Sequence, residues 1–374
     1  MICGGGTAGH VYPGLALAEA LKAADSDTEV IFVGSERGLE SKVVPQNGYV
    51  LETLPVRGLP RRLSLNTLSF AAGLSFSLAK AARLLKKYRP AAIIGMGGFA
   101  GFPMVLVGAR LGYPTLIHEQ NAVPGLANRW LSRRVDLVAL TYNDHLDMIK
   151  GAKVVKVIGN PVREAVLKAK RPTALKVLGL DDGRITVLVF GGSRGAQKIN
   201  QAVIGAYDSF RRAHNLQIIH IPGMIEYDAI KQQLDGLRQP HDNVKYHLFP
   251  YVEEMGLAYA AADLVVSRAG AGTLAEVTGR GLPSILVPYP YATDNHQAAN
   301  AKWLESAGAA KVIPDDNFND RLFWQAISSF LYHPATLDEM ADRSKRLGHP
   351  KAARKLASLV LKAAANGKKS QRDT

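Results

Sequence analysis

Apolar and polar residues alternate along the chain in blocks that predict short strands followed by helices. Short apolar runs bounded by glycine, proline or aspartate are typical of buried strands. The predicted strands are 29–33, 50–54, 91–95, 115–118 and 137–140 in the first half, and 185–190, 217–220, 244–247, 264–266 and 284–287 in the second. Strands that alternate with helices indicate βαβ units, so we expect an α/β protein with parallel sheets.

The predicted helices fill the segments between these strands. They are 13–23, 65–88, 101–111, 125–131, 196–211, 224–234, 252–260, 273–280 and 295–306, followed by 318–331, 335–347 and 350–365 at the end of the chain. The charged tail 367–374 has the composition of a disordered terminus, and we expect it to lack regular structure.

Two similar strand-to-helix glycine turns predict two Rossmann-like domains. The first turn covers residues 2–9 and the second covers residues 189–196. We expect a first domain over 1–160, a second over 161–348, and a C-terminal helix with a flexible tail over 349–374. A first strand of Met1, Ile2 and Cys3 is short for a central strand, so we expect the natural start to lie a few residues upstream.

Composition and charge narrow the classes of function. A chain of 374 residues that is 47% hydrophobic and 21% charged is not wholly disordered. One cysteine excludes an internal disulfide framework and a four-cysteine zinc site. No secretory signal is visible at the start of the sequence, and a reducing compartment fits.

The net charge of +14 favours a polyanionic partner, namely nucleic acid, an anionic membrane or a phosphate-bearing substrate. The alternative is a basic protein whose charge serves only solubility. The sequence has no zinc finger, helix-turn-helix or RNA-recognition pattern, so no nucleic-acid partner is expected.

The segment 65–88 predicts one long helix with an unusually wide apolar surface. Its serines make it a poor membrane span, but cations flank the apolar residues, as binding to an anionic bilayer surface requires. The predicted membrane patch consists of Phe70, Leu74, Leu78, Arg61, Arg62 and Lys80. A core helix with a solvated basic end is the alternative.

Glycine loops follow two of the predicted strands in the first half. Residues 4–10 and 95–103 let the backbone approach an anion closely, which suits phosphate or pyrophosphate. Neither loop has the lysine-serine pair of a P-loop kinase. Gly4, Gly6 and Gly9 have dinucleotide-binding spacing, but only Glu36 could supply the acidic partner of a nicotinamide site.

Candidate proton-transfer groups sit beside these loops. His10 follows the first glycine turn and could accept a proton from a sugar hydroxyl, and residues 118–121 (His-Glu-Gln-Asn) end a strand in the same region. In the second half, residues 191–196, 267–276 and 294–297 suit diphosphate, ribose and sugar hydroxyls. Ordinary capping and packing are the alternative for each of these segments.

Six motifs in order closely resemble the MurG family of bacterial glycosyltransferases. They are GGGTAGHVYPGLALAEAL, GMGGFAGFP, HEQNAVPGLANR, GNPVR, GGSRGAQ and SRAGAGTLAEVTGRGLPSILVPYPYATDNHQAANA. The resemblance covers about residues 1–350. It implies the GT-B fold, in which two Rossmann-like domains face each other across a cleft and a C-terminal helix returns to the first domain.

The resemblance also implies a reaction. Members of the family transfer N-acetylglucosamine from UDP-GlcNAc to the C4 hydroxyl of the muramoyl sugar of lipid I, with inversion, and so form lipid II for peptidoglycan. Members work at the cytoplasmic face of the bacterial membrane as peripheral proteins, which suggests cell-wall synthesis proteins as further partners. We expect no cofactor and no catalytic metal, because no Asp-x-Asp motif suited to a diphosphate-bound metal occurs.

The family's site residues carry over to matching positions of this chain. His10 is the favoured base and Glu119 the second choice. Gly97 and Gly98 are expected to hold the acceptor pyrophosphate. The implied UDP-GlcNAc contacts are Thr7, Ala8, Gly9, Asn121, Arg163, Ser193, Val252, Ala271, Gly272, Thr273, Leu274, Ala275, Glu276 and Gln297. Two alternatives stay open: another GT-B enzyme with a lipid acceptor such as diacylglycerol, and a non-catalytic UDP-sugar-binding membrane scaffold.

Overall fold

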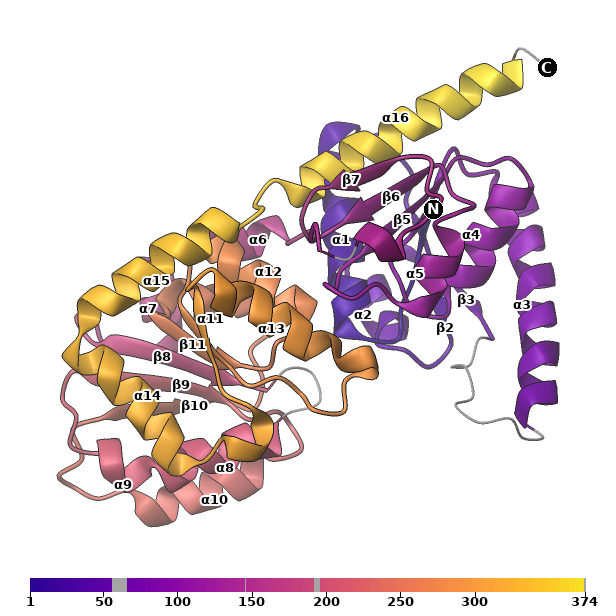
Figure 1. Ribbon diagram of the computed structural model, residues 1–374. Helices are drawn as coiled ribbons and strands as arrows, with labels where there is room; N and C mark the ends of the chain where they lie inside the picture. Colours follow the sequence, from indigo (N-terminus) through magenta and orange to yellow (C-terminus); the bar gives the residue numbers. More distant parts are fainter. Residues whose placement is uncertain (56–65, 145, 192–195, 373–374) are drawn as a thin grey trace. The chain divides into compact units, whose positions relative to one another are not determined.

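The computed structural model describes residues 1–55, 66–144, 146–191 and 196–372, and it describes side chains for all of these except 66–72 and 368–372. The chain forms two compact units (Figure 1). Unit 1 comprises Met1–Arg163 and Pro350–Thr374, and unit 2 comprises Glu164–His349. Within the described residues, no helix is both long and apolar enough to cross a membrane.

The sheet of unit 1 has seven parallel strands in the order β3-β2-β1-β4-β5-β6-β7. They are β1 (Ile2–Cys3), β2 (Ile31–Ser35), β3 (Val50–Leu54), β4 (Ile93–Gly95), β5 (Thr115–Glu119), β6 (Leu137–Leu140) and β7 (Val155–Val157). Strand order reverses between β1 and β4, so the loops that follow these two strands meet at the carboxyl edge of the sheet. In open α/β sheets this switch point is where ligands bind.

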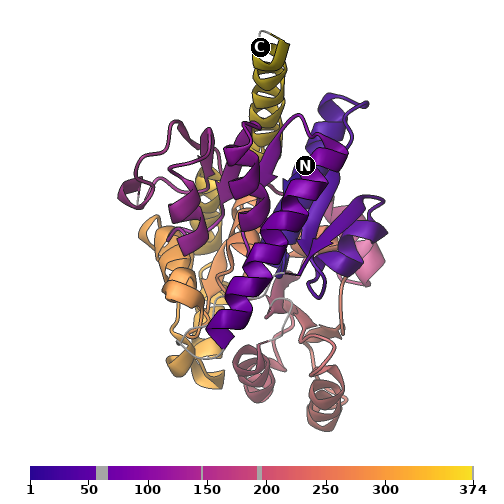
Figure 2. The same cartoon turned by 90° about the vertical axis from the view of Figure 1, so that its right-hand side faces the viewer.

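Helices cover both faces of this sheet. They are α1 (Ala8–Ala24), α2 (Glu40–Gln46), α3 (Asn66–Tyr88), α4 (Gly101–Arg110), α5 (Leu126–Leu131) and, from the end of the chain, α16 (Ala352–Arg372). The long helix α3 lies beside α4 and β3 (Figure 2). Helix α16 packs along α1, where Leu356 and Val360 join the apolar cluster that contains Leu15 and Leu17.

The sheet of unit 2 has six parallel strands in the order β10-β9-β8-β11-β12-β13. They are β8 (Ile185–Phe190), β9 (Leu216–Ile221), β10 (Lys245–Leu248), β11 (Leu264–Ser267), β12 (Ser284–Leu286) and β13 (Ala310–Val312). The order reverses between β8 and β11, so unit 2 repeats the switch point of unit 1 at the loops after these two strands.

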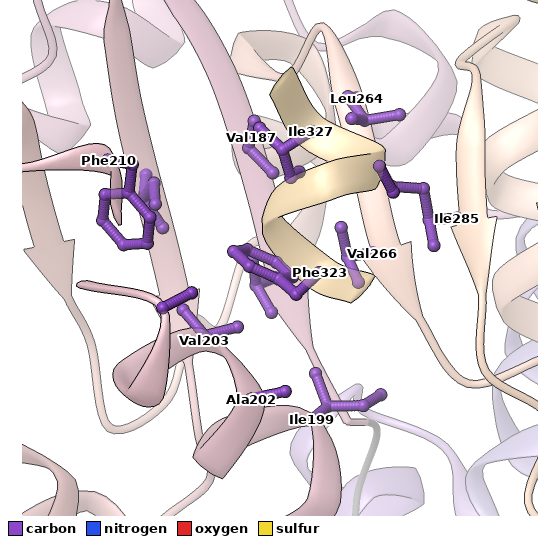
Figure 3. Packing of buried hydrophobic residues seen from close by; sticks show 14 of the residues in the cluster. Val187, Ile199, Ala202, Val203, Phe210, Leu264, Val266, Ile285, Phe323 and Ile327 are labelled. Atoms are coloured by element: carbon purple, nitrogen blue, oxygen red, sulfur yellow. The ribbon is translucent and has the colours of Figure 1, made fainter. Parts of the chain in front are cut away.

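Unit 2 contains ten α-helices among the residues that the structure describes. They are α6 (Glu164–Lys168), α7 (Arg171–Leu178), α8 (Gln197–Gly205), α9 (Tyr207–Phe210), α10 (Tyr227–Leu237), α11 (Met255–Ala261), α12 (Ala271–Arg280), α13 (His296–Ser306), α14 (Asp320–Tyr332) and α15 (Pro334–Leu347). The largest core cluster of the unit packs Val187 and Val266 of the sheet against Val203 of α8 and Phe323 of α14 (Figure 3). This packing fixes β8 and β11, the two strands between which the strand order reverses.

The structure differs from the sequence prediction in several elements. The predicted helix 196–211 is two helices, α8 and α9, separated at Ala206 after Gly205. Strands β7 and β13 and helices α2, α6 and α7 were not predicted, because they are short and carry little apolar periodicity. The expectation of a disordered tail from residue 367 is wrong for 367–372, where α16 continues to Arg372. Lysine, glutamine and arginine in this stretch are good helix formers, and Gly367 lies against Pro114.

We expect Leu356→Ala to lower the free energy of unfolding of unit 1 by about 2–5 kcal/mol, because it removes a fully buried side chain between α16 and α1. The neighbouring Lys355 is exposed, so Lys355→Ala should change the free energy by less than about 0.5 kcal/mol. Urea unfolding followed by circular dichroism measures both. Equal effects of the two variants would contradict the packing of α16 on α1.

Candidate active site

The first glycine turn presents His10 at the start of α1. Thr7 precedes the helix, and its carbonyl accepts hydrogen bonds from the amides of His10 (3.1 Å) and Val11 (3.2 Å). The Nδ1 atom of His10 lies 3.1 Å from the carbonyl oxygen of Gly5 and 3.3 Å from the hydroxyl of Thr7. A carbonyl oxygen can only accept, so the bond to Gly5 requires the proton on Nδ1. In the neutral ring this leaves the lone pair on Nε2.

The second glycine loop, after β4, packs directly on the first. A Cβ on Gly98 would lie 2.5 Å from the Gly5 carbonyl oxygen, and a Cβ on Gly4 would lie 2.8 Å from that of Gly97. A Cβ on Gly97 would lie 2.8 Å from Cδ2 of the His10 ring. Gly97 and Gly98 also have positive φ angles of 87° and 76°. Only glycine therefore fits this junction, which holds the two loops and the imidazole together.

Buried polar residues at the end of β5 support the junction of the two glycine loops. His118 is fully buried, its Nε2 donates to the Gly159 carbonyl (3.0 Å), and its Nδ1 accepts from Gln120 (3.1 Å). Gln120 also donates to the carbonyl of Met96, at 2.8 Å. Burial lowers the pKa of His118 to about 4, so the ring is neutral at pH 7. His118 and Gln120 are therefore structural polar groups that fix the start of the second glycine loop.

Both oxygens of Glu119 accept hydrogen bonds from the segment that follows β5. Oε1 accepts from the amide of Asn121 (3.0 Å), and Oε2 accepts from the amide of Gly125 (3.0 Å) and from the side chain of Asn128 (2.8 Å). Only 3% of Glu119 is exposed. This carboxylate holds the turn that presents Asn121 and leads into α5.

A functional candidate that the sequence analysis did not single out is Glu40, the first residue of α2. It is 1% exposed, and its carboxylate accepts from the amides of Gly6 (2.8 Å) and Ser35 (2.7 Å). In the sequence, Glu40 is only one acidic residue among others. The one local sign of a special position is the pair of nearby glycines, Gly34 and Gly38, which both pack against its carboxylate.

Arg163 is held by unit 1 itself. Its Nε donates to Glu19 on α1 at 2.7 Å, and its guanidinium also donates to Asn47 at 3.2 Å. Glu19 lies nine residues beyond His10, or about 14 Å along the helix. Within unit 1, the structure therefore does not bring Arg163 to the glycine turn with Thr7, Ala8 and Gly9.

In unit 2, the loop after β11 opens α12 at the switch point. Gly270 precedes the helix with an extended backbone, so the first amides of α12 are directed toward the loop. Gly272 and Thr273 are partly exposed there, whereas Ala271 and Leu274 are buried and can offer a ligand only their backbone. A helix N-terminus of this kind favours a phosphate group.

The carboxylate of Glu276 is oriented by a buried tyrosine. The hydroxyl of Tyr259 donates to Oε2 of Glu276 at 2.8 Å, and Tyr259 is 1% exposed. Burial raises the pKa of Tyr259 well above its usual value, so the hydroxyl keeps its proton and remains a donor. Glu276 is partly exposed and lies five residues, a little over one turn, beyond Ala271. It can therefore accept from hydroxyl groups next to the phosphate-binding end of α12.

The segment before α13 is strained and held in place by Gln297. Asp294 and Asn295 have positive φ angles of 51° and 50°, which are uncommon outside glycine. Oε1 of Gln297 accepts from the amide of Tyr289 at 2.9 Å. The side-chain nitrogen of Gln297 is then the group that can donate to a sugar oxygen.

Val252 follows β10 and is 8% exposed. Its side chain is buried, so a ligand could contact only its backbone.

Several predicted residues lie outside the described part of the chain or pack against the core. Ser193, Arg61, Arg62 and the side chain of Phe70 lie outside the described residues. Leu74, Leu78 and Lys80 of α3 are half-buried, and Leu78 packs against the core cluster that contains Leu84 and Leu85. Phe76 is the large apolar residue of α3 that is most exposed among those described, at 57%.

Comparisons with known families and structures agree with the two-unit architecture. The family models of the glycosyltransferase family 28 N-terminal and C-terminal domains match residues 1–140 and 186–356. MurG from Acinetobacter baumannii has a crystal structure that superimposes with a TM-score of 0.76 at 28% identity, covering 97% of this chain and 99% of that one. A UDP-GlcNAc 2-epimerase from Neisseria meningitidis, at 14% identity and a TM-score of 0.65, shares the fold.

Curated relatives match along nearly the whole chain. A protein of Halothermothrix orenii is 43% identical over 361 residues, covering 96% of both chains, and one of Limosilactobacillus fermentum is 41% identical over 371 residues, covering 99% of both. Both are named "UDP-N-acetylglucosamine--N-acetylmuramyl-(pentapeptide) pyrophosphoryl-undecaprenol N-acetylglucosamine transferase". This chain belongs to that family of glycosyltransferases, the MurG family.

Proposed function

We propose that this chain transfers N-acetylglucosamine from UDP-GlcNAc to the C4 hydroxyl of the muramoyl sugar of lipid I, an undecaprenyl-pyrophosphoryl acceptor, to give lipid II. Membership of the MurG family supports the reaction, since the names of the relatives state this donor and acceptor. Glycine loops and a helix N-terminus at the two switch points support binding of phosphate-bearing substrates.

The observation that carries the mechanism is the hydrogen bond from Nδ1 of His10 to the Gly5 carbonyl, because it leaves the lone pair on Nε2. The acceptor hydroxyl gives its proton to Nε2, and its oxygen forms a bond to the anomeric carbon of N-acetylglucosamine. The bond from that carbon to the diphosphate breaks, and UDP leaves with the electron pair. One displacement of this kind inverts the anomeric carbon and gives a β(1→4) linkage.

Glu119 acts in this scheme as a positioning residue. Its two oxygens already accept hydrogen bonds from Asn121, Gly125 and Asn128, and protonation would weaken all of them. A general base gains a proton in every turnover, so His10 suits the role better. Asn121, held by this carboxylate, is the contact that we propose for the hydroxyls of N-acetylglucosamine.

Phosphate and nucleotide binding divide between the two units in this proposal. Unit 1 binds the acceptor, whose pyrophosphate lies against the loop with Gly97 and Gly98. Unit 2 binds the UDP part of the donor, with the diphosphate at the start of α12, the ribose on Glu276 and the uracil on the backbone of Val252. Gln297 contacts the donor sugar in addition to Asn121. The amides at the start of α12 stabilise the charge that develops on departing UDP.

We further propose that the enzyme works as a peripheral protein at the cytoplasmic face of the membrane. The acceptor carries a lipid, and the exposed Phe76 together with Lys80 on α3 supports contact with an anionic bilayer surface. Cell-wall synthesis proteins that make lipid I or use lipid II are the partners that such a location would favour.

The reaction itself is tested with labelled UDP-GlcNAc and a short-chain lipid I analogue, with and without a chelator. We expect label in a β-linked disaccharide lipid, and the same rate with the chelator. Diacylglycerol serves as the competing acceptor. Binding of UDP-GlcNAc without transfer to lipid I would contradict the proposal, and so would preferential transfer to diacylglycerol.

For His10→Gln we expect kcat to fall about 100- to 10,000-fold, because the variant loses general-base catalysis. The KM for UDP-GlcNAc should change by less than about threefold. His214 of unit 2 is exposed, and His214→Gln is the matched control with wild-type kinetics. A His10→Gln variant that is folded and retains more than about a tenth of the wild-type kcat would exclude His10 as the base.

For Glu276→Ala we expect the affinity for UDP to weaken about 10- to 100-fold, because a charged acceptor for the ribose hydroxyls is lost. Isothermal titration calorimetry with UDP measures the change. Glu253 is an exposed glutamate of unit 2, and Glu253→Ala serves as the control. Unchanged UDP affinity in Glu276→Ala would remove Glu276 from the nucleotide site.

A further inference from the structure

Glu40 is a buried carboxylate, 1% exposed, that lies close to the proposed base. Its Oε2 accepts from the Gly6 amide at 2.8 Å, and its Oε1 accepts from the amide and hydroxyl of Ser35 at 2.7 and 2.6 Å. No lysine, arginine or histidine lies within ion-pair distance of it among the residues described. Within the described part of the chain, its negative charge is therefore stabilised by backbone and hydroxyl donors.

The sequence around Glu40 is shaped to hold this carboxylate. A Cβ on Gly5, Gly34 or Gly38 would come within 2.4 Å of Glu40 side-chain atoms. These glycines lie after β1, within β2 and just before α2. Three separate segments thus lack side chains where they surround one glutamate. A carboxylate that only capped a helix would not need such an enclosure.

One peptide unit connects Glu40 to His10. The Gly6 amide that donates to Glu40 and the Gly5 carbonyl that accepts from His10 belong to the same trans peptide. The N–H and C=O of a trans peptide point in opposite directions. Glu40 therefore fixes the orientation of the Gly5 carbonyl from the opposite side, and that carbonyl fixes which nitrogen of His10 carries the proton.

We propose that Glu40 is a positioning residue for His10 and acts through the Gly5–Gly6 peptide, an inference that rests on His10 being the base of the proposed reaction. Hydrogen bonds in a chain polarise one another, so a carboxylate on the amide makes the carbonyl a stronger acceptor. When Nε2 takes the proton of the acceptor hydroxyl, the Nδ1 proton stays on the ring. The imidazolium then faces a carbonyl that the charge of Glu40 has strengthened.

Glu40 keeps its charge throughout this cycle. Burial raises its pKa, but the hydrogen bonds from the Ser35 hydroxyl and from the backbone amides of Gly6 and Ser35 outweigh burial, and the pKa is lowered overall. The proton that enters at Nε2 therefore leaves from the imidazole, and Glu40 is never protonated. Its part is to orient and to stabilise charge, as a buried aspartate does for a catalytic histidine.

A purely structural role for Glu40 makes a different prediction. If Glu40 only connected α2 to β2, loss of its hydrogen bond from the Ser35 hydroxyl would lower kcat as much as loss of its charge. Ser35→Ala removes that 2.6 Å bond and leaves the Gly6 amide and its peptide untouched. This variant is therefore the matched control for Glu40→Gln.

The test measures kinetics and the His10 tautomer in the full chain. In Glu40→Gln we expect kcat to fall about 10- to 100-fold, the range typical of residues that orient a catalytic ligand, with the KM for UDP-GlcNAc within about twofold. Nitrogen NMR of the histidine rings should show the Nδ1–H tautomer for His10 in the wild type and a mixture in Glu40→Gln. His10→Gln identifies the signal among the 10 histidines. Ser35→Ala should keep the wild-type kcat and tautomer.

Two results would overturn the proposal: a folded Glu40→Gln with wild-type kcat and tautomer, or a wild-type His10 whose proton is on Nε2. The second needs no Glu40 variant, so the test survives if Glu40→Gln does not fold. Failure of the proposed function is distinct, because the wild type would then form no lipid II. Failure of His10 as the base is distinct too, because His10→Gln would then be active whatever Glu40→Gln does.

Discussion

The rest of the site depends on the close approach of two backbone loops at the β1/β4 switch point of unit 1. A Cβ on Gly98 would lie 2.5 Å from the Gly5 carbonyl oxygen, and a Cβ on Gly97 would lie 2.8 Å from Cδ2 of the His10 ring. Since Gly4, Gly5, Gly97 and Gly98 have no side chains, the Gly5–Gly6 peptide can lie between Glu40 and His10. The parallel sheet brings the loops to the same edge, and the glycines let them touch.

Three buried polar side chains near this junction hold backbone in place through hydrogen bonds. His118, Gln120 and Glu119 each bind main-chain atoms of neighbouring segments. In unit 2, Tyr259 orients Glu276, and the partly buried Arg268 pairs with Asp315 and donates to the carbonyl of Val287 after β12. A polar group buried without a partner is costly, so such networks favour one arrangement of the loops.

The sequence predicted the parallel two-sheet fold well, together with the glycine-rich turns after β1, β4 and β11, because periodicity and glycine spacing are local signals. It does not predict which polar side chains are engaged by hydrogen bonds from distant parts of the chain. Glutamate is a residue type that can act as a base. The hydrogen bonds that Glu119 accepts from the amides of Asn121 and Gly125 become visible only when β5 and α5 are placed in three dimensions. Glu40 lies 34 positions from Gly6. Arg163 is similar, since its partner Glu19 is 144 residues away.

The central claim is that Nε2 of His10 takes the proton of the acceptor hydroxyl. The most direct test is a crystal structure of the complex with a lipid I analogue and a non-transferable UDP-GlcNAc analogue. The account predicts the C4 hydroxyl oxygen about 2.6–3.2 Å from Nε2 and in line with the anomeric carbon. A C4 hydroxyl bound instead to Glu119, or beyond reach of His10 even through one water, would contradict it.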